Sequence, residues 1–356
     1  MTHRSQGFWG CLLAGLLLTT AAACADPTTV SDAASTPGST GSSTASTAAT
    51  VPATKADPAV EALVPAALKQ KGTLVLATNA PYPPLEYFKE DNKTLIGYDI
   101  DLGNAIGAAM GLKVEWKNIS FDSIIPGLQA GKYDGGIAGF SIEHERLGTV
   151  DFVSYYLSGG GFLIKKGSGI KVGSFADLCG YRVAVQKGVS QVDALVDASK
   201  DCVAEGKKAI TINQIPDQNV VVLNLASGRA DVVVGDKPQV EYAAGHAEGL
   251  CVVSTYQTGH SIAGIAVPKG KKDVTAALQA AINHLIENGD YAQISKVWNT
   301  GVAVEGATLS DQYQKVSEPW GVGPDGTVKK SLVFTDPAAI PPGHTYYYQP
   351  IREGCA

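Results

Sequence analysis

Short apolar runs alternate with amphipathic segments along most of the chain. Aliphatic runs at Leu74–Ala77, Val183–Val185 and Val232–Val234 predict buried strands. Between Asp99, a candidate helix cap, and Met110, apolar residues recur at helical spacing, and a glycine follows. This alternation of strands and helices predicts an α/β fold.

One turn-and-strand pattern occurs twice. Residues 128–134 read Leu-Gln-Ala-Gly-Lys-Tyr-Asp, residues 225–231 read Leu-Ala-Ser-Gly-Arg-Ala-Asp, and a strand-like segment follows each. Many α/β units share such a turn, but two copies, each with its own upstream strand, predict two lobes of similar plan. Ligands of open α/β sheets bind beyond the carboxyl ends of the strands, so we expect Gly139 and Asp236 on opposite walls of one cleft.

The N-terminus predicts an export signal over residues 1–24. A basic start, an apolar run at residues 8–18 and a stretch of small residues are typical of such a signal, and the run is too short for a membrane span. The sequence Ala-Ala-Ala-Cys ending at Cys24 resembles a bacterial lipobox, so we expect Cys24 to carry a lipid. Ordinary cleavage after an Ala-x-Ala site is the alternative. Residues 25–64 then form a flexible linker, because most of them are Ala, Ser, Thr, Gly, Pro or Asp without apolar periodicity.

Net charge and cysteine usage narrow the classes of function. A net charge of -6 without basic clusters argues against a nucleic-acid partner. The four cysteines after the linker form an even set suited to disulfides in an oxidising compartment, and their spacings do not indicate a zinc site. We pair Cys179 with Cys202, closing a loop that a disulfide stabilises by about 3 kcal/mol. Cys251 with Cys355 follows by elimination, and no metal or cofactor is expected.

The segment Gly97–Leu102, Gly-Tyr-Asp-Ile-Asp-Leu, resembles the signature of the family 3 periplasmic solute-binding proteins, the polar-amino-acid receptors of ABC importers. The resemblance runs from about Gly72 to Trp298. Further hallmarks of that family occur in order at residues 82–87, 121–128, 145–146, 151–152 and 185–188. The resemblance implies two α/β lobes of a type II-like periplasmic-binding-protein fold, joined by two crossing strands, with the ligand in the cleft between the lobes.

The family's crossing strands imply the domain boundaries. Lobe 1 would comprise residues 72–157 and 262–305, and lobe 2 would comprise residues 158–261. Residues 306–356 would form a C-terminal extension that packs on the body, because its aromatic residues and Cys355 make it too apolar for a free tail.

Two charged residues are the implied anchors for an amino-acid ligand. Arg146 would bind the α-carboxylate, because a planar guanidinium donates two parallel hydrogen bonds. A surface arginine on a helix is the alternative. Asp236 ends an apolar strand and would accept from the α-ammonium, since an unpaired carboxylate is costly to bury. An ion pair of Asp236 with Lys237 or Arg229 is the alternative there.

Seven further residues are implied in the pocket. Ser141 and Gly139 would hold the ligand's backbone groups, Ser190 would do so from a helix start, Tyr82 and Phe121 would sandwich its side chain, and Asn79 and Gln186 would line the side-chain pocket. By residue type alone, each of these residues could equally well occupy a turn, a helix cap or the core and bind no ligand. Several relatives that bind cationic amino acids have an aspartate in place of Asn79, so a neutral polar ligand such as glutamine is expected. Glu143 either reaches the pocket or starts a helix.

Together these residues predict an extracytoplasmic, lipid-anchored, monomeric receptor that captures an amino acid and delivers it to an ABC permease. Binding needs no catalytic group, so no enzymatic activity is expected. A dehydratase of the cyclohexadienyl or arogenate type on the same fold is the alternative, and Glu143 is its candidate acid. A sensory ectodomain is a third interpretation, which the lack of a membrane-length apolar run after the signal disfavours.

Overall fold

The computed structural model describes residues 50–142, 144–157, 159–257, 262–299, 302–303, 307, 347–348 and 352–355. All of these belong to one compact unit, residues 48–356. The predicted export signal, the lipidation site Cys24, Glu143 and most of the predicted linker and C-terminal extension lie outside the described residues.

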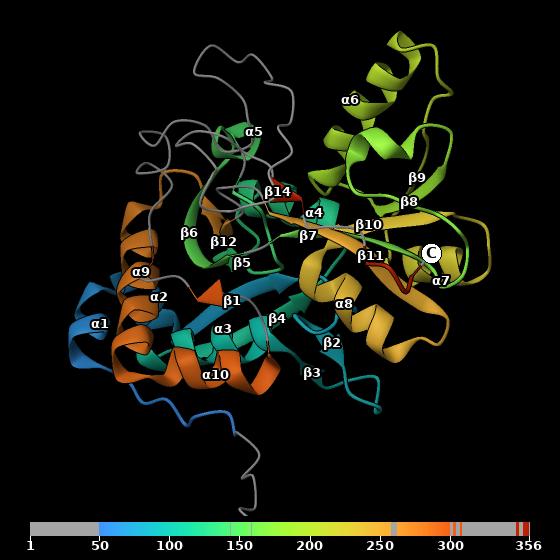
Figure 1. Ribbon diagram of the computed structural model, residues 1–356. Coiled ribbons are helices and arrows are strands. Elements are labelled where there is room, and N and C mark those ends of the chain that lie inside the picture. Colours follow the sequence, from blue (N-terminus) through green and yellow to red (C-terminus); the bar gives the residue numbers. More distant parts are fainter. Residues whose placement is uncertain are drawn as a thin grey trace, which may run out of the picture. The chain divides into compact units, whose positions relative to one another are not determined.

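The first of two large sheets has a parallel half and an antiparallel half (Figure 1). Its strands are, in spatial order, β13 (Val302–Ala303), β6 (Val150–Leu157), β12 (Ile262–Pro268), β5 (Gly135–Gly136), β1 (Thr73–Thr78) and β4 (Lys113–Asn118). β1 runs parallel to β4 and β5, whereas β12 runs antiparallel to β5 and β6. β1 is buried from Leu74 onward, as its aliphatic run predicts.

The second sheet repeats this plan. Its strands are, in spatial order, β14 (Tyr347–Tyr348), β11 (Leu250–Gln257), β7 (Gly160–Lys165), β10 (Val232–Asp236), β8 (Arg182–Gln186) and β9 (Thr211–Ile215). β8 runs parallel to β9 and β10, and β7 runs antiparallel to β10 and β11. The repeated turn of the sequence precedes β5 and β10, which occupy equivalent places in the two sheets. A separate hairpin consists of β2 (Tyr87–Phe88) and β3 (Leu95–Ile96).

Helices cover both faces of each sheet. The helices that pack with the first sheet are α1 (Pro58–Leu63), α2 (Ala66–Lys71), α3 (Tyr98–Ala109), α4 (Phe121–Gln129), α5 (His144–Leu147), α9 (Lys272–Asn288) and α10 (Asp290–Trp298). Those of the second sheet are the single 3-10 turn η1 (Phe175–Leu178), α6 (Gln191–Ala204), α7 (Gln218–Ala226) and α8 (Lys237–His246). In the first sheet, α3 and α9 share one apolar core and α4 belongs to another. In the second sheet, α6 and α7 likewise belong to two different apolar cores.

The chain passes from the first sheet to the second after β6 and returns after β11. We call the first sheet with its helices the first lobe (described residues 50–157 and 262–307). The second sheet with its helices is the second lobe (described residues 159–257 and 347–355). The predicted α/β fold of two lobes is therefore confirmed.

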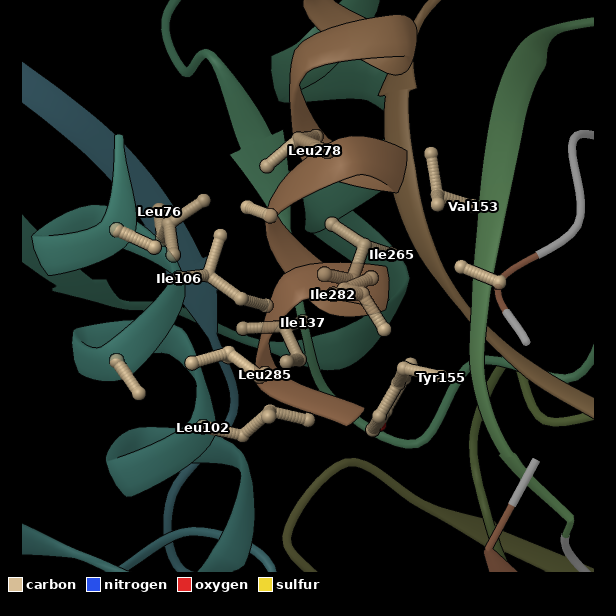
Figure 2. Close-up of a cluster of buried hydrophobic side chains, with 14 of the residues drawn as sticks. Leu76, Leu102, Ile106, Ile137, Val153, Tyr155, Ile265, Leu278, Ile282 and Leu285 are labelled. Carbon is tan, nitrogen blue, oxygen red and sulfur yellow. The ribbon is translucent and has the colours of Figure 1, made fainter. Parts of the chain in front are cut away.

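One large apolar core fills the first lobe between the sheet and the helices α3 and α9. Figure 2 shows Leu76 of β1, Ile106 of α3, Ile265 of β12 and Ile282 of α9 in this cluster, and all four side chains are buried. Full burial of side chains of this size contributes about 1.5–3 kcal/mol each. α9, which belongs to the returning part of the chain, is therefore firmly fixed to the same sheet as α3.

The helix predicted to start at Asp99 begins one residue earlier, and Asp99 is not its cap. α3 has Gly97 as N-cap, without a side-chain cap bond. Gly97 has a φ of 136°, and a Cβ there would overlap the Leu85 carbonyl, so this close approach requires glycine. Asp99 is fully buried instead, and its carboxylate accepts hydrogen bonds from the Gly139 N–H and the Tyr155 hydroxyl.

The last residues of the predicted linker form α1 and pack on the first lobe. Val60 and Val64 are buried in its core, beside α9. Asp57 caps the helix by accepting from the N–H groups of Ala59 and Val60. The linker prediction is therefore wrong for residues 58–64. The small polar residues of the preceding segment dominate the composition of the region, so Val60 in the helix and Val64 at its C-cap were overlooked.

The two predicted disulfides are both present in the second lobe. Cys179–Cys202 joins the end of η1 to α6, and Cys251–Cys355 joins β11 to the C-terminal residues, with Cα atoms 5.6 Å apart in each. β14 pairs with the end of β11 in the same region. The last described residues of the chain thus belong to the second lobe.

Candidate functional site

A small cavity lies between the two lobes, with about 10 Å³ of free space. The residues predicted to bind a ligand all line it: Asn79, Tyr82, Phe121, Gly139, Ser141, Arg146, Gln186, Ser190 and Asp236. This free space is about what one water molecule needs, so the lobes meet closely around the cavity, and an amino acid would need them to move apart.

The ends of strands and helices position the two walls. In the first lobe, Asn79 follows β1, Phe121 begins α4 and α5 carries Arg146. In the second lobe, Gln186 ends β8 and Asp236 ends β10. Because parallel strands present their carboxyl ends at the same edge of a sheet, the polar residues that follow them converge there.

The Asp236 carboxylate is buried and bound by two neutral donors. The Tyr82 hydroxyl donates to Oδ2 at 2.8 Å, and Gln191 Nε2 donates to Oδ1 at 2.8 Å. Burial raises the pKa of Asp236, although both hydrogen bonds act to lower it. Lys237, one partner in the alternative ion pair, binds Glu241 at 2.7 Å. A carboxylate oxygen accepts more than one hydrogen bond, so Asp236 retains capacity for a cationic group in the cavity.

The Arg146 guanidinium is oriented by backbone carbonyls from both lobes. Nη1 donates to the Ser141 carbonyl at 2.9 Å, and Nη2 donates to the Gly188 carbonyl at 3.0 Å. The guanidinium carbon lies 5.6 Å from the ring centroids of both Phe121 and Phe140. A cation held in this way on the cavity wall provides an anchor for a carboxylate.

A pair of amide side chains connects the two walls. Gln186 Nε2 donates to Asn79 Oδ1 at 2.7 Å, and Asn79 Nδ2 donates to the Ile119 carbonyl at 2.8 Å. The pair brings polar atoms without formal charge to the cavity. This part of the wall suits a polar, uncharged group.

The remaining predicted residues contribute in different ways. Ser190 stands at the N-cap of α6 without a side-chain cap bond, and its hydroxyl donates to Gln191 Oε1 at 3.3 Å. The simple cap considered for Ser190 is therefore not formed. The Gly139 N–H already donates to Asp99. The Phe121 ring stacks on a neighbouring phenylalanine with centroids 4.6 Å apart, which fixes its orientation beside the cavity.

A buried pair of carboxyl groups beside the cavity was not predicted. Glu86 lines the cavity and lies near enough to Asp99 for the two charges to act on each other, and both side chains are almost wholly buried. Burial raises the pKa of Glu86 well above its usual value and raises the pKa of Asp99 to about 7. Ionising two neighbouring buried carboxyl groups at once is costly, because desolvation and the repulsion of like charges both oppose it. Both acids belong to the recognised motifs, but the motifs do not show that they meet.

Three other lining residues were also missed by the sequence analysis: Ala138, Val189 and Gln191. Gln191 directly follows Ser190, and its position at the start of α6 was the available signal. Its side chain matters because it holds one oxygen of Asp236.

Among the described residues, no group of three or more His, Cys, Asp or Glu side chains is placed to hold a metal ion. None of the helices that the structure describes is both long and apolar enough to cross a membrane. Glu143, the candidate acid of a dehydratase, lies outside the described residues.

Comparison with known proteins adds independent observations. The family model for bacterial extracellular solute-binding proteins, family 3, matches residues 74–301. The arginine-binding protein ArgT of Corynebacterium glutamicum is 35% identical over 242 residues, which are 68% of this chain and 79% of that protein.

Two solved structures of ancestral arginine-binding proteins are also similar. One, bound to arginine, has 33% sequence identity and a TM-score of 0.59, and the match covers 64% of this chain and 99% of that one. The other, bound to glutamine, has 34% identity and a TM-score of 0.56, and the match covers 64% of this chain and 97% of that one.

Proposed function

We propose a role for this chain, which belongs to the bacterial extracellular solute-binding proteins, family 3: it captures a free amino acid between its lobes and delivers it to an ABC permease. The resemblance predicted from the sequence motifs is confirmed by that membership. The observation that carries the proposal is the placement of Arg146 and Asp236 on the walls of one cavity between the lobes. A fixed cation and a buried carboxylate match the two charges of every free α-amino acid.

We further propose a neutral polar side chain for the ligand, with glutamine first. The amide pair of Asn79 and Gln186 supports this choice, because it brings hydrogen-bonding atoms without formal charge. Arginine is the competing ligand, since ArgT is named for binding it and Glu86 adds a carboxyl group to the wall. Burial raises the pKa of Glu86, which reduces its attraction for a cation and favours glutamine.

Capture requires closure of the lobes rather than a chemical step. The hydrogen bonds from Tyr82 to Asp236 and from Gln186 to Asn79 already join the lobes. An α-ammonium would add a charged donor to Asp236, and an α-carboxylate would add a charged acceptor to Arg146. The ligand would therefore stabilise the closed arrangement through its differential affinity for it. No catalytic group is needed, so we propose a receptor rather than a dehydratase.

The proposed location is the outer face of the cell membrane, with a lipid on Cys24 and the residues up to α1 as a tether. The lipobox-like sequence and the composition of residues 25–57 support this. Cells fed labelled palmitate should label the protein, and Cys24→Ser should abolish the label. Label retained in that variant would contradict the lipid anchor and leave ligand binding untouched. We propose that the anchored protein acts as a monomer.

A thermal-shift panel of amino acids tests the binding function. At a ligand concentration 100 times Kd, binding stabilises the folded protein by about 2.7 kcal/mol, which raises Tm by roughly 5–10 °C in a protein of this size. A response to glutamine supports the full proposal. A response to arginine alone keeps the receptor and overturns the neutral side chain. A flat panel, or turnover of prephenate or arogenate, contradicts the receptor.

A further inference from the structure

Two sequence motifs that only partly belong to the ligand pocket meet between the lobes. In the first lobe, Phe121 begins α4 and Asp122 follows it. In the second lobe, Gln186 ends β8 and Lys187 follows it. Phe121 and Gln186 line the cavity, whereas the residue after each lies outside it. In each motif one residue faces the cavity and the next contacts the other lobe.

An ion pair connects these two neighbours. Lys187 Nζ lies 2.7 Å from Asp122 Oδ2, and the two side chains are 53% and 27% exposed. The hydrogen bond from Lys187 is the main reason that the pKa of Asp122 lies below its usual value. With both side chains partly exposed, the ion pair stands at the solvent-exposed rim of the cleft.

The backbone beside the ion pair also joins the lobes. Gly188 has a φ of 82°, and a Cβ there would lie 3.0 Å from Asp122 Cβ, so the two main chains approach closely. The Gly188 carbonyl accepts a hydrogen bond from Arg146 Nη2 at 3.0 Å. The ion pair thus belongs to a continuous strip of contact that reaches the proposed carboxylate anchor.

We propose that Asp122 and Lys187 form a latch that sets how long a bound amino acid stays in the closed cleft, an inference that rests on the proposed function. The two residues come from opposite lobes, so the ion pair breaks whenever the cleft opens, and a ligand held between the lobes leaves after that opening. Asp122 and Lys187 are positioning residues, because neither lines the cavity.

The expected effect of the latch is modest and specific. Exposed ion pairs contribute little each, so loss of the latch should speed dissociation by about two- to five-fold. Association should change less, because the ligand enters while the lobes are apart. High salt should reduce the difference, since ions screen an exposed pair.

The test compares dissociation of radiolabelled L-glutamine and L-arginine from the parent protein and its variants. Lys187→Met keeps the aliphatic stem and removes the charge, so it should release ligand faster. Lys187→Arg should stay close to the parent rate. The double variant Asp122→Lys, Lys187→Asp exchanges the two charges and should return the dissociation rate most of the way to that of the parent. A merely structural role for either residue would not predict this recovery.

A matched control is available within the first lobe. Lys71 Nζ lies 2.7 Å from Asp134 Oδ2, with side chains 42% and 22% exposed. Lys71→Met therefore removes an ion pair of the same length and similar exposure that does not cross the cleft. It should leave ligand dissociation unchanged.

A measurement without ligand separates this proposal from the amino-acid function. Spin labels at Lys93 and Leu223, exposed residues in different lobes, report the distance between the lobes. Lys187→Met should increase the open population with no ligand present. If neither amino acid binds while this population shifts, the proposed function fails and the latch on closure stands. Unchanged distances and rates in Lys187→Met, or equal changes in Lys71→Met, would overturn the latch.

Discussion

The two lobes share one arrangement of strands but are stabilised in different ways. In the first lobe, α9 and α10 from the returning chain pack against α3, and the core joins segments that are far apart in sequence. In the second lobe, Cys179–Cys202 and Cys251–Cys355 cross-link the described residues. Apolar packing thus supports both lobes, and the second lobe, with the smaller cores, adds two covalent cross-links to it.

The two lobes also contribute unequally to the wall of the cavity. The first lobe provides Asn79, Tyr82, Phe121, Gly139, Ser141 and Arg146, and the second lobe provides Gln186, Ser190 and Asp236. The lobe with the larger apolar core carries most of the wall, including both aromatic side chains proposed to hold the ligand. A rigid first lobe that receives the ligand and a second lobe that closes on it would explain this asymmetry.

Removal of the longer cross-link should have the largest effect. Cys251→Ser with Cys355→Ser opens a loop of 104 residues, which should lower the unfolding free energy by about 4–5 kcal/mol. Hydrogen exchange should locate the loss in the second sheet. The matched pair Cys179→Ser with Cys202→Ser opens a loop of 23 residues and should cost about 3 kcal/mol. Equal loss of protection in the first sheet would contradict the comparison of the lobes.

Asp236→Ala should weaken amino-acid binding by at least about 30-fold. The substitution leaves the charge of the ligand's ammonium without its partner, which typically costs roughly 2–5 kcal/mol. Isothermal titration with glutamine and with arginine measures the loss. Tyr82→Phe is the control, because it removes one neutral donor to Asp236 and should cost only about 1 kcal/mol. If Asp236→Ala binds amino acids with undiminished affinity, Asp236 does not bind the α-ammonium, and this part of the proposal is wrong.

The buried acids of the first lobe should make its stability fall as pH rises. The folded pKa of Asp99, about 7, lies above the usual 3.8, so the folded protein holds this proton more tightly than the unfolded chain does. The stabilisation is complete below about pH 4 and is lost as pH rises through about 7, with a change of about 2 kcal/mol between pH 5 and pH 7. The raised pKa of Glu86 acts in the same direction.

The variant Asp99→Asn tests the assignment of this pH dependence. An amide at residue 99 can still accept from the Gly139 N–H and the Tyr155 hydroxyl, but it does not titrate. Tm measured against pH should therefore become flatter than in the parent. A profile parallel to that of the parent would show that other groups set the dependence.

Gly188→Ala should have the smallest effect, about a five-fold loss of affinity. A Cβ at this position would press on Asp122 in the first lobe and hold the cleft slightly open. Gly206→Ala is the matched control, because Gly206 has a similar φ of 74° but nothing within 4 Å of an added Cβ. Both variants bear the same backbone strain, of order 1 kcal/mol. Titration should show an affinity loss in Gly188→Ala alone.

Most of the site could be predicted only through the family resemblance, because few of its residues leave a local trace. Asp236 is an exception: it ends an apolar strand that begins with three valines, so it was placed at the edge of a sheet before its partners were known. Arg146 could be placed only through the motif that precedes it. The aliphatic runs predicted the buried strands, since burial on both faces demands apolar side chains.

The missed features depend on contacts between segments that are distant or compositionally biased. Glu86 and Asp99 form a pair only because a loop meets α3, and neither segment alone shows that its acid is buried. Asp99 also looked like a helix cap, the usual place for an acid before an amphipathic run. Val60 and Val64 were overlooked because the small polar residues before them dominate the composition of the region.

The C-terminal strand β14 affects how easily the second sheet can pair with a strand of another molecule. β14 lies at the edge of the second sheet and pairs with Tyr256 and Gln257, and the Arg352 N–H donates to the Val253 carbonyl further along the same strand. An uncovered edge strand offers free N–H and C=O groups to any other strand and promotes aggregation. The edge strand β14 has only two residues and is a poor template for pairing, so residues that do not line the cavity make this side of the sheet less able to pair with another molecule.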